Sequence, residues 1–494
     1  MVATTPGADG GSTDAERHAR ERRPRALVIT DDVLTGQMAG PAIRSWHVAE
    51  ALTSVADVVL ATTSGSCEVP ATSFVAEAAE EQRFEELERW CDVLVMQGYV
   101  LHKVPALRRS DKRIVFDVYD PVHLEALELT RNIPEPERSF HVRNSVRTLE
   151  EQLVRGDFFV CASDKQRDFW LGFLASVGRV NPRTYEDDPT LRRLIDVVPF
   201  GLPDAPPVHT RPALRGVVEG IGPDDDVVLW GGGVYDWFDP QTLIRAVATL
   251  RSRRPRVRLF FMGMRHPKPD VATSPVALAA RRLADDLGLT GTHVFFNEGW
   301  VPYDERQNVL LEADVGVSLH HDTVETTVSF RTRMLDYLWA GLPVVASAGD
   351  SFAELIAAED IGTVVAPGDV DDVARAIGAL LDDGERRRRC GQRAQAVAAR
   401  FRWSVAAAPL VAYCAAPRRA ADAPQWAAPP SPPSPSSPRG GGGVPGGVPL
   451  GPAPVGLRAV VQDLRRARRM YAQGGARAVA ADARRWVRDR LARR

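Results

Sequence analysis

Short runs of β-branched and other apolar residues recur along the chain, and stretches with helical spacing separate them. The first six runs lie at residues 26–30, 58–60, 93–96, 114–118, 158–161 and 197–201. Strands that are buried on both faces read as continuous apolar runs, and their alternation with helices is typical of parallel sheets. The sequence therefore predicts a doubly wound, Rossmann-like α/β domain over residues 26–202.

The same pattern restarts after a passage rich in proline and acidic residues. The next runs lie at residues 227–230, 259–262, 294–296, 315–318, 344–346 and 363–365. A chain of 494 residues is too long for one ordinary domain, and its 44% of hydrophobic residues can fill two cores. We therefore expect a second doubly wound domain over residues 203–400, and the two domains should face each other across a cleft.

The two ends of the chain differ in composition from the expected domains. Residues 1–25 are polar and contain no apolar stretch that could act as a secretion signal or membrane span, so they predict a disordered lead-in. Residues 401–422 predict a helix that packs back towards the first domain. Residues 423–455 are dominated by proline, serine and glycine, which is typical of a flexible linker.

The last segment, residues 456–494, predicts a basic amphipathic helical tail. It carries about a dozen arginines against Asp463, Asp482 and Asp489. Such a helix can lie on the anionic inner leaflet of a membrane, which would place the protein at the inner face of the cell membrane. A solvated helix face or a docking helix for a protein partner would show the same pattern.

Overall charge and cysteine usage exclude several classes of protein. The formal net charge of −2 argues against a nucleic-acid binder, because such domains usually carry a strong basic excess. The five cysteines are widely spaced, without a Cys-x-x-Cys motif or a Cys/His cluster. This spacing favours a cytoplasmic protein without a structural metal site.

Residues 329–346 combine charges that suit a nucleotide sugar. Asp336 lies on a predicted helix that ends at a Gly-Leu-Pro turn, and Ser329, Arg331 and Arg333 precede it. A carboxylate can bind ribose or sugar hydroxyls, while arginines can bind a diphosphate. An amphipathic helix whose arginine and aspartate form only solvated pairs would look the same, so the motif by itself leaves both interpretations open.

The order of these segments over residues 26–417 resembles the retaining glycosyltransferases of family 4, which have the two-domain glycosyltransferase B (GT-B) fold. The resemblance implies transfer of a hexose-type sugar from a nucleoside-diphosphate sugar to a hydroxyl acceptor, with retention of the anomeric configuration. A glycan or lipid-linked acceptor, and a role in cell-envelope polysaccharide or glycolipid synthesis, are the corresponding expectations. No tightly bound cofactor is expected, and a magnesium ion on the diphosphate is left open.

The resemblance also implies roles for two glycine-rich loops. Gly40 lies in a loop similar to the one that approaches the donor phosphate or the acceptor in the family, although Gly40-Pro41 could be only a helix start. Gly231, Gly232 and Gly233 stand where the family places the amides that face the diphosphate, although a bare strand-to-helix turn would also need glycine. Residues 295–302 are similar to the segment that borders the nucleotide base.

The match to the two-glutamate motif of the family is incomplete. Asp336 falls on the second acid, which is expected to bind the ribose hydroxyls, but Val328 falls on the first acid, which is expected to bind the donor sugar. Glu325 is the nearest replacement. The usual lysine of the first loop in the second domain is also missing, which leaves Arg331 and Arg333 as candidates for the diphosphate charge.

On the first domain, residues 116–125 lie where the family often keeps a cleft histidine near the acceptor. Asp120 directly follows a predicted strand and is our first candidate for a catalytic residue, with His123 as the alternative. Two other functions remain open. The same fold can carry a sugar-nucleotide epimerase, and Val328 is compatible with a catalytically idle scaffold that binds nucleotides or glycans.

Overall fold

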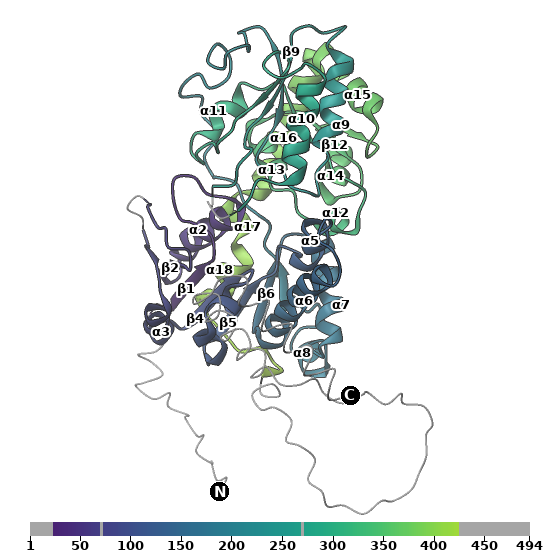
Figure 1. Cartoon of the computed structure of the whole chain (residues 1–494). Coiled ribbons are helices and arrows are strands. Elements are labelled where there is room, and N and C mark those ends of the chain that lie inside the picture. Colours follow the sequence, from purple (N-terminus) through teal and green to yellow (C-terminus); the bar gives the residue numbers. More distant parts are fainter. Residues whose placement is uncertain (1–22, 70–72, 268–270, 424–494) are drawn as a thin grey trace, which may run out of the picture. The chain divides into compact units, whose positions relative to one another are not determined.

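The computed structural model describes residues 23–69, 73–267 and 271–423 (Figure 1). These residues belong to one compact unit, which covers residues 1–429. The predicted lead-in up to residue 22, the linker from residue 424 onwards and the basic tail all lie outside the described residues.

The first lobe is built on a seven-stranded parallel sheet with the strand order β3-β2-β1-β4-β5-β6-β7. Its strands are β1 (Arg25–Thr30), β2 (Asp57–Thr62), β3 (Val75–Ala78), β4 (Val93–Gln97), β5 (Arg113–Asp117), β6 (Phe158–Cys161) and β7 (Ile195–Val197). Its helices are α2 (Gly40–Leu52), α3 (Glu81–Trp90), α4 (Val100–Lys103), the 3₁₀ helix Pro105–Arg109, α5 (Val122–Leu129), α6 (Glu137–Arg155), α7 (Asp164–Ser176) and α8 (Pro182–Asp187).

The second lobe is built on a six-stranded parallel sheet with the strand order β10-β9-β8-β11-β12-β13. Its strands are β8 (Asp226–Trp230), β9 (Val257–Phe261), β10 (Val294–Phe296), β11 (Val315–Ser318), β12 (Val344–Ser347) and β13 (Gly362–Val365). Its helices are α9 (Pro240–Leu250), α10 (Pro275–Asp286), α11 (Arg306–Leu311), α12 (Val324–Val328), α13 (Arg333–Ala340), α14 (Ser351–Glu359), α15 (Val370–Asp382) and α16 (Gly384–Ala398). The prediction of two doubly wound α/β domains is confirmed.

Each sheet is covered by helices on both faces, as alternate residues of single strands show. In β1, Val28 packs in the cluster that contains α2, whereas Leu27 packs in the cluster that contains α3, α6 and α7. Because successive side chains of a strand point to opposite faces, this alternation proves that both faces are buried. The cluster around Val28 also contains Val227 and Val344 of the second lobe, so one core runs through both lobes.

After α16 the chain passes through the 3₁₀ helix Ala399–Phe401 and forms two short helices, α17 (Trp403–Ala406) and α18 (Ala408–Ala415), where one helix over residues 401–422 was predicted. Pro409 stands in the first turn of α18, where a proline starts a helix and cannot continue one. Tyr413 of α18 stacks on Phe158 of β6 with ring centroids 4.6 Å apart. The segment therefore packs on the first lobe through this contact.

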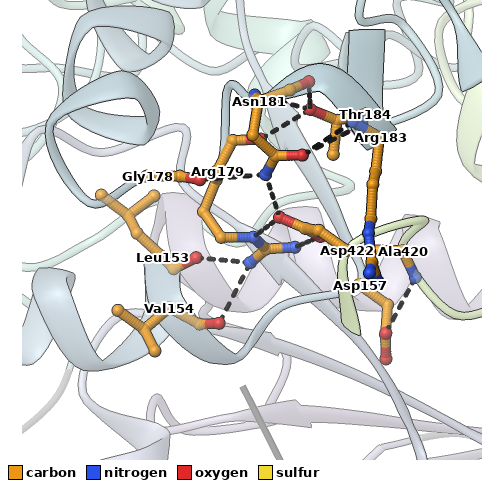
Figure 2. A network of polar contacts seen from close by, with 10 residues as sticks. All are labelled: Leu153, Val154, Asp157, Gly178, Arg179, Asn181, Arg183, Thr184, Ala420 and Asp422. Carbon is orange, nitrogen blue, oxygen red and sulfur yellow. Dashed lines mark hydrogen bonds and ion pairs between the residues drawn. The ribbon is translucent and has the colours of Figure 1, made fainter. Parts of the chain in front are cut away.

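A buried polar network fixes the end of this returning segment (Figure 2). The Arg179 guanidinium donates two hydrogen bonds to the Asp422 carboxylate, at 2.8 and 3.0 Å, and a third at 2.7 Å to the Leu153 carbonyl. The Asn181 amide also donates to Asp422, at 2.9 Å. Because both charged partners are almost fully buried, the loss of either one would leave the other uncompensated.

Candidate active site

A cavity of about 380 Å³ lies where the carboxyl ends of the parallel strands open. The first lobe lines it with the loop that enters α2 and with the segment after β5. The second lobe contributes the loop after β8 and residues 329–336 at the start of α13. Open α/β sheets bind ligands at this edge, because loops and helix starts gather there.

Most of the predicted site residues line this cavity. They are Gly40, Asp120, Gly231, Gly232, Gly233, Ser329, Arg331, Arg333 and Asp336. His123 and Glu325 do not line it. The structure therefore brings nine residues from distant parts of the chain to one cavity, while their roles as ligands stay predictions.

The glycine loop after β8 offers fewer free amides than its sequence suggests. The Gly231 N–H already donates to the Tyr337 hydroxyl at 2.7 Å. The Gly233 carbonyl accepts from Arg333 at 2.6 Å and from the Trp230 indole at 3.3 Å. Within the described residues, the N–H groups of Gly232 and Gly233 have no hydrogen-bond partner, and Gly232 has a φ of 77°, which favours glycine. Two donors therefore remain for a ligand.

Arg333 is a buried cation beside these amides. Its guanidinium lies over the ring of Phe238 at 4.0 Å and over the ring of Trp230 at 4.6 Å, and the residue is 7% exposed. It forms no ion pair with any described carboxylate, and its Nη1 has no hydrogen-bond partner there. Burial lowers the pKa of Arg333 to about 10, which still leaves it charged at neutral pH. An uncompensated cation next to free amides suits an anionic group.

Arg331, in contrast, is already neutralised. Its two terminal nitrogens donate to the two oxygens of Glu325, at 2.9 and 2.6 Å, and Ser329 donates its hydroxyl to the same carboxylate. Glu325 is buried, so it holds Arg331 and does not face the cavity. Val328, which stands in the place of the first acid of the motif, is also buried.

Asp336 has a partner that sequence reasoning missed. Arg306 donates from Nε to Asp336 Oδ1 at 2.9 Å and lies over the rings of Tyr303 at 3.6 Å and Trp339 at 4.7 Å. Arg306 precedes Asp336 by 30 residues on another helix. No local spacing therefore signals the pair, and only the packing of α11 against α13 produces it.

The first lobe presents two carboxyl groups to the cavity. Burial raises the pKa of Asp120 to about 7; a hydrogen bond from Tyr119 opposes the shift, and the nearby Asp117 carboxylate adds to it. Burial, reinforced by the charges of Asp120 and Glu325, raises the pKa of Glu125 well above its usual range. Glu125 was not predicted as a site residue, although its place in the first turn of α5, just after Asp120, is a usable signal.

His123, the alternative to Asp120, lies in an aromatic cluster on α5 and α7. Its ring stacks on Phe169 with centroids 5.7 Å apart and meets Phe173 at 5.2 Å. Burial lowers its pKa to about 4, so the imidazole is neutral at physiological pH. These contacts account for His123 as a core residue of the first lobe.

Hydrogen bonds join the lobes at the rim of the cavity. Gln37 Nε2 donates to the Trp300 carbonyl at 3.0 Å, and Trp300 Nε1 donates to the Met38 carbonyl at 3.2 Å. Trp300 and Val301 line the cavity, so part of the segment that was predicted to border the base does reach it.

The described residues hold no cluster of three or more histidine, cysteine or acidic side chains that could bind a metal ion. The open expectation of a magnesium ion on the diphosphate concerns a ligand-borne ion and stays a prediction. None of the described helices has both the length and the apolar character that crossing a bilayer requires.

Comparisons with known proteins agree with this picture. Residues 218–397 match the family of glycosyl transferases group 1. A stretch of 193 residues is 32% identical to D-inositol 3-phosphate glycosyltransferase 2 of Catenulispora acidiphila and covers 38% of this chain and 43% of that protein. A stretch of 217 residues is 31% identical to D-inositol 3-phosphate glycosyltransferase of Nocardia farcinica and covers 43% of this chain and 45% of that protein. The matched stretches thus span less than half of these relatives.

Solved structures resemble almost the whole described chain. Sucrose-phosphate synthase from Thermosynechococcus elongatus matches with a TM-score of 0.55 and 16% identity, over 78% of this chain and 97% of that one. Anabaena HepE in complex with UDP-glucose matches with a TM-score of 0.54 and 15% identity, over 79% and 98% of the two chains. At such identities the likeness shows the fold alone, and the fold is GT-B.

Proposed function

We propose that this chain, whose second lobe is a glycosyltransferase group 1 domain on the GT-B fold, transfers a hexose-type sugar from a nucleoside-diphosphate sugar to an acceptor hydroxyl. The observation that carries this proposal is Arg333, a buried cation without a carboxylate partner among the described residues, beside two free glycine amides. This arrangement lacks a counter-charge of its own, and a diphosphate would supply it.

In the proposed mechanism, the second lobe stabilises the leaving group. The bond between the anomeric carbon and the diphosphate oxygen breaks, and negative charge grows on the diphosphate. Arg333 and the amides of Gly232 and Gly233 would bind this charge, and Arg333 is already held in place by its hydrogen bond to the Gly233 carbonyl and by the Phe238 ring. Asp336 would accept a hydrogen bond from the ribose of the nucleotide.

The first lobe would act on the acceptor. Asp120 lines the cavity, and its raised pKa of about 7 suits a group that accepts the proton of the attacking hydroxyl near neutral pH. Burial, reinforced by the charges of Asp120 and Glu325, raises the pKa of Glu125 well above its usual range, which favours the protonated carboxyl group, and that form can donate a hydrogen bond to a sugar oxygen. The two carboxyl groups can therefore take different roles on one wall.

We further propose that the transfer retains the anomeric configuration, so that the acceptor oxygen bonds to the anomeric carbon on the face that the diphosphate leaves while Asp120 accepts the hydroxyl proton, and that it serves cell-envelope polysaccharide or glycolipid synthesis. The family 4 motif around Asp336 supports retention, and two similar proteins are named for transfer to an inositol phosphate. Nuclear magnetic resonance of the product would decide the first point, because a product with the inverted anomeric configuration would contradict retention. The acceptor remains a glycan or lipid-linked hydroxyl in this proposal.

Turnover tests the proposal directly. The full chain is incubated with a panel of nucleoside-diphosphate sugars and an extract of envelope glycans and lipids, and the release of nucleoside diphosphate is measured. We expect one donor to give release that depends on the extract. Arg254→Met is a suitable control, because Arg254 pairs with Asp226 at 3.2 Å outside the cavity. Release by no donor would contradict the proposal.

A catalytically idle scaffold is the second candidate function, and one observation favours it. Val328 is buried and Glu325 is engaged by Arg331, so neither offers a carboxylate to the donor sugar. A scaffold would bind a nucleotide sugar in the cavity without releasing nucleoside diphosphate. The turnover assay combined with a binding assay therefore separates the two functions.

Association with the inner face of the cell membrane through the arginine-rich segment 456–494 is also a proposal. Each arginine near an anionic surface contributes about 1 kcal/mol to binding. Flotation of the full chain with vesicles that contain an anionic lipid would be compared with a chain truncated at Pro454. Equal flotation of the two chains would contradict a role for this segment.

A further inference from the structure

Arg306 is a cavity-lining cation whose position is fixed from several sides. Its guanidinium lies over the rings of Tyr303 and Trp339, with 3.6 Å and 4.7 Å to the two centroids, and its Nη1 donates to the Tyr303 carbonyl at 2.5 Å. The residue is 5% exposed. Stacking on two aromatic rings and a backbone hydrogen bond leave the Arg306 side chain little freedom.

The immobilised guanidinium in turn holds Asp336. Arg306 Nε donates to Oδ1 of Asp336 at 2.9 Å, while Oδ2 has no hydrogen-bond partner among the described residues. The Asp336 side chain is 30% exposed and lines the cavity. One carboxylate oxygen is thus anchored, and the other is left for a donor from a ligand.

The pair also solves an electrostatic problem of the proposed site. A lone carboxylate in a cavity for a diphosphate would repel the ligand, and the repulsion would be strong in a partly buried place. The charge of Arg306 compensates that of Asp336 without removing its capacity to accept a hydrogen bond. Arg306 therefore reduces the repulsion between the Asp336 carboxylate and a diphosphate.

We propose that Arg306 is a positioning residue that holds the Asp336 carboxylate in place to accept a hydrogen bond from a ribose hydroxyl, so that the site selects ribonucleotides over deoxyribonucleotides. This inference rests on the proposed function, because it needs a nucleoside diphosphate in the cavity. It differs from a purely structural role of the ion pair, which would affect both kinds of nucleotide equally.

The test measures nucleoside diphosphate binding by calorimetry. UDP, GDP, ADP and CDP are titrated into the full chain, and the one that binds is compared with its 2′-deoxy and 3′-deoxy forms. We expect at least one deoxy form to bind roughly ten- to a hundredfold more weakly, because a hydrogen bond to a charged acceptor is lost. In Arg306→Met this ratio should fall to about twofold or less, because a freely rotating carboxylate gains little from the hydroxyl.

Three further proteins make the result specific. Asp336→Asn should lose the discrimination as well, and combining it with Arg306→Met should add nothing more, because both changes remove one interaction. Arg306→Lys keeps the charge but not the flat stacking surface, so it should keep only part of the discrimination. Arg254→Met should discriminate like the parent chain.

The outcomes separate the inference from the function on which it rests. If no nucleoside diphosphate binds the parent chain, both are overturned. If one binds and Arg306→Met still prefers the ribonucleotide by the parent ratio, the inference alone fails. The inference alone also fails if the parent chain binds the ribonucleotide and its deoxy forms equally well. Should Arg306→Met fail to fold by circular dichroism, Arg306→Lys and Asp336→Asn decide the question.

Discussion

The two walls of the cavity carry different ionisable groups. The second lobe presents Arg333 and Arg306, which are stacked on aromatic rings, whereas the first lobe presents Asp120 and Glu125. The arginines stay charged in their buried places, whereas the pKa values of both carboxyl groups are raised. One wall is thus suited to hold an anion, and the other to exchange protons and hydrogen bonds with a sugar.

This difference explains why one wall could be interpreted from motifs and the other could not. Charge stabilisation needs a fixed cation, and residues 329–336 carry one close to the Asp336 motif. Proton transfer needs a tuned environment, which neighbours from several segments create. For Asp120 these neighbours include Tyr119, Asp117 and Glu325, and Glu325 belongs to the other lobe.

The largest expected effect concerns the acid wall, which is the part of the cavity lined by Asp120 and Glu125 of the first lobe. Asp120→Asn should lower kcat by roughly 10²–10⁴-fold, because the acceptor hydroxyl loses its proton acceptor. In the parent enzyme, kcat/KM should rise with pH through about 7, since the proposed proton acceptor is the ionised Asp120 carboxylate and burial raises the pKa of Asp120 to about 7. The variant should lack this rise. A pH profile of donor turnover measures both effects.

The same raised pKa predicts the stability of the protein against pH. A carboxyl group with a folded-state pKa above its unfolded value stabilises the fold at low pH, and this contribution is lost as pH rises through about 7. Asp120→Asn should therefore flatten the dependence of the free energy of unfolding on pH between about 4 and 7. Asp168→Asn, an exposed change on α7, is the matched control. An unchanged profile in Asp120→Asn would contradict the assignment.

The next largest effect is expected at the cation wall, which is the part of the cavity lined by Arg333 and Arg306 of the second lobe. Arg333→Met should lower kcat/KM for the donor by about 10²–10³-fold, since the variant removes the charge that is proposed to stabilise the leaving group. Asp120→Asn should leave donor binding nearly intact. The two variants together therefore distinguish the contribution of the cation wall to donor binding from that of the acid wall to turnover. Steady-state kinetics with the donor found in the panel would show this. Equal losses of donor affinity in both variants would contradict the division.

A region outside both walls should affect stability without affecting chemistry. Asp422→Ala leaves the Arg179 guanidinium buried without its carboxylate, so the free energy of unfolding should fall by about 3–5 kcal/mol. Glu385→Ala, which breaks an exposed ion pair with Arg388, should change it little. Urea unfolding measures both. If the Asp422→Ala variant folds but binds the donor with altered affinity, the Arg179–Asp422 network affects the cavity, and the expectation is contradicted.

The smallest effect is expected at the rim, where the walls meet. Gln37→Ala removes one exposed hydrogen bond between the lobes, so KM should rise by roughly two- to fivefold with kcat almost unchanged. The comparison variant is Gln241→Ala, which lies on α9 outside the cavity lining. A large fall in kcat for Gln37→Ala would mean that closure of the lobes limits the reaction.

Much of the fold could be predicted because the central strands are buried on both faces and therefore appear as apolar runs. The edge strand β3 escaped prediction, since its residues Val75–Ala78 are only partly buried or exposed and include Glu77. The site was harder to predict from the sequence than the fold. Asp336 and Arg333 lie within one short motif, whereas Arg306 reaches Asp336 only through packing of two helices.

Glu325 shows the limit of reasoning from spacing. It lies three residues from the expected acid, yet its carboxylate turns to Arg331 and Ser329 and leaves the cavity wall. Sequence distance could not reveal this, because a helical segment of five residues decides where the side chain points. The sequence was more informative for Asp120, which lies shortly after the buried strand β5 ends at Asp117.

The central claim is that this cavity binds a nucleoside diphosphate between the two walls. A crystal structure of the full chain with the nucleoside diphosphate that binds in calorimetry tests it most directly. We predict that the diphosphate contacts Arg333 and the amides of Gly232 and Gly233, and that the ribose lies on Asp336. A nucleotide bound elsewhere, or bound here with its diphosphate away from Arg333, would contradict the account.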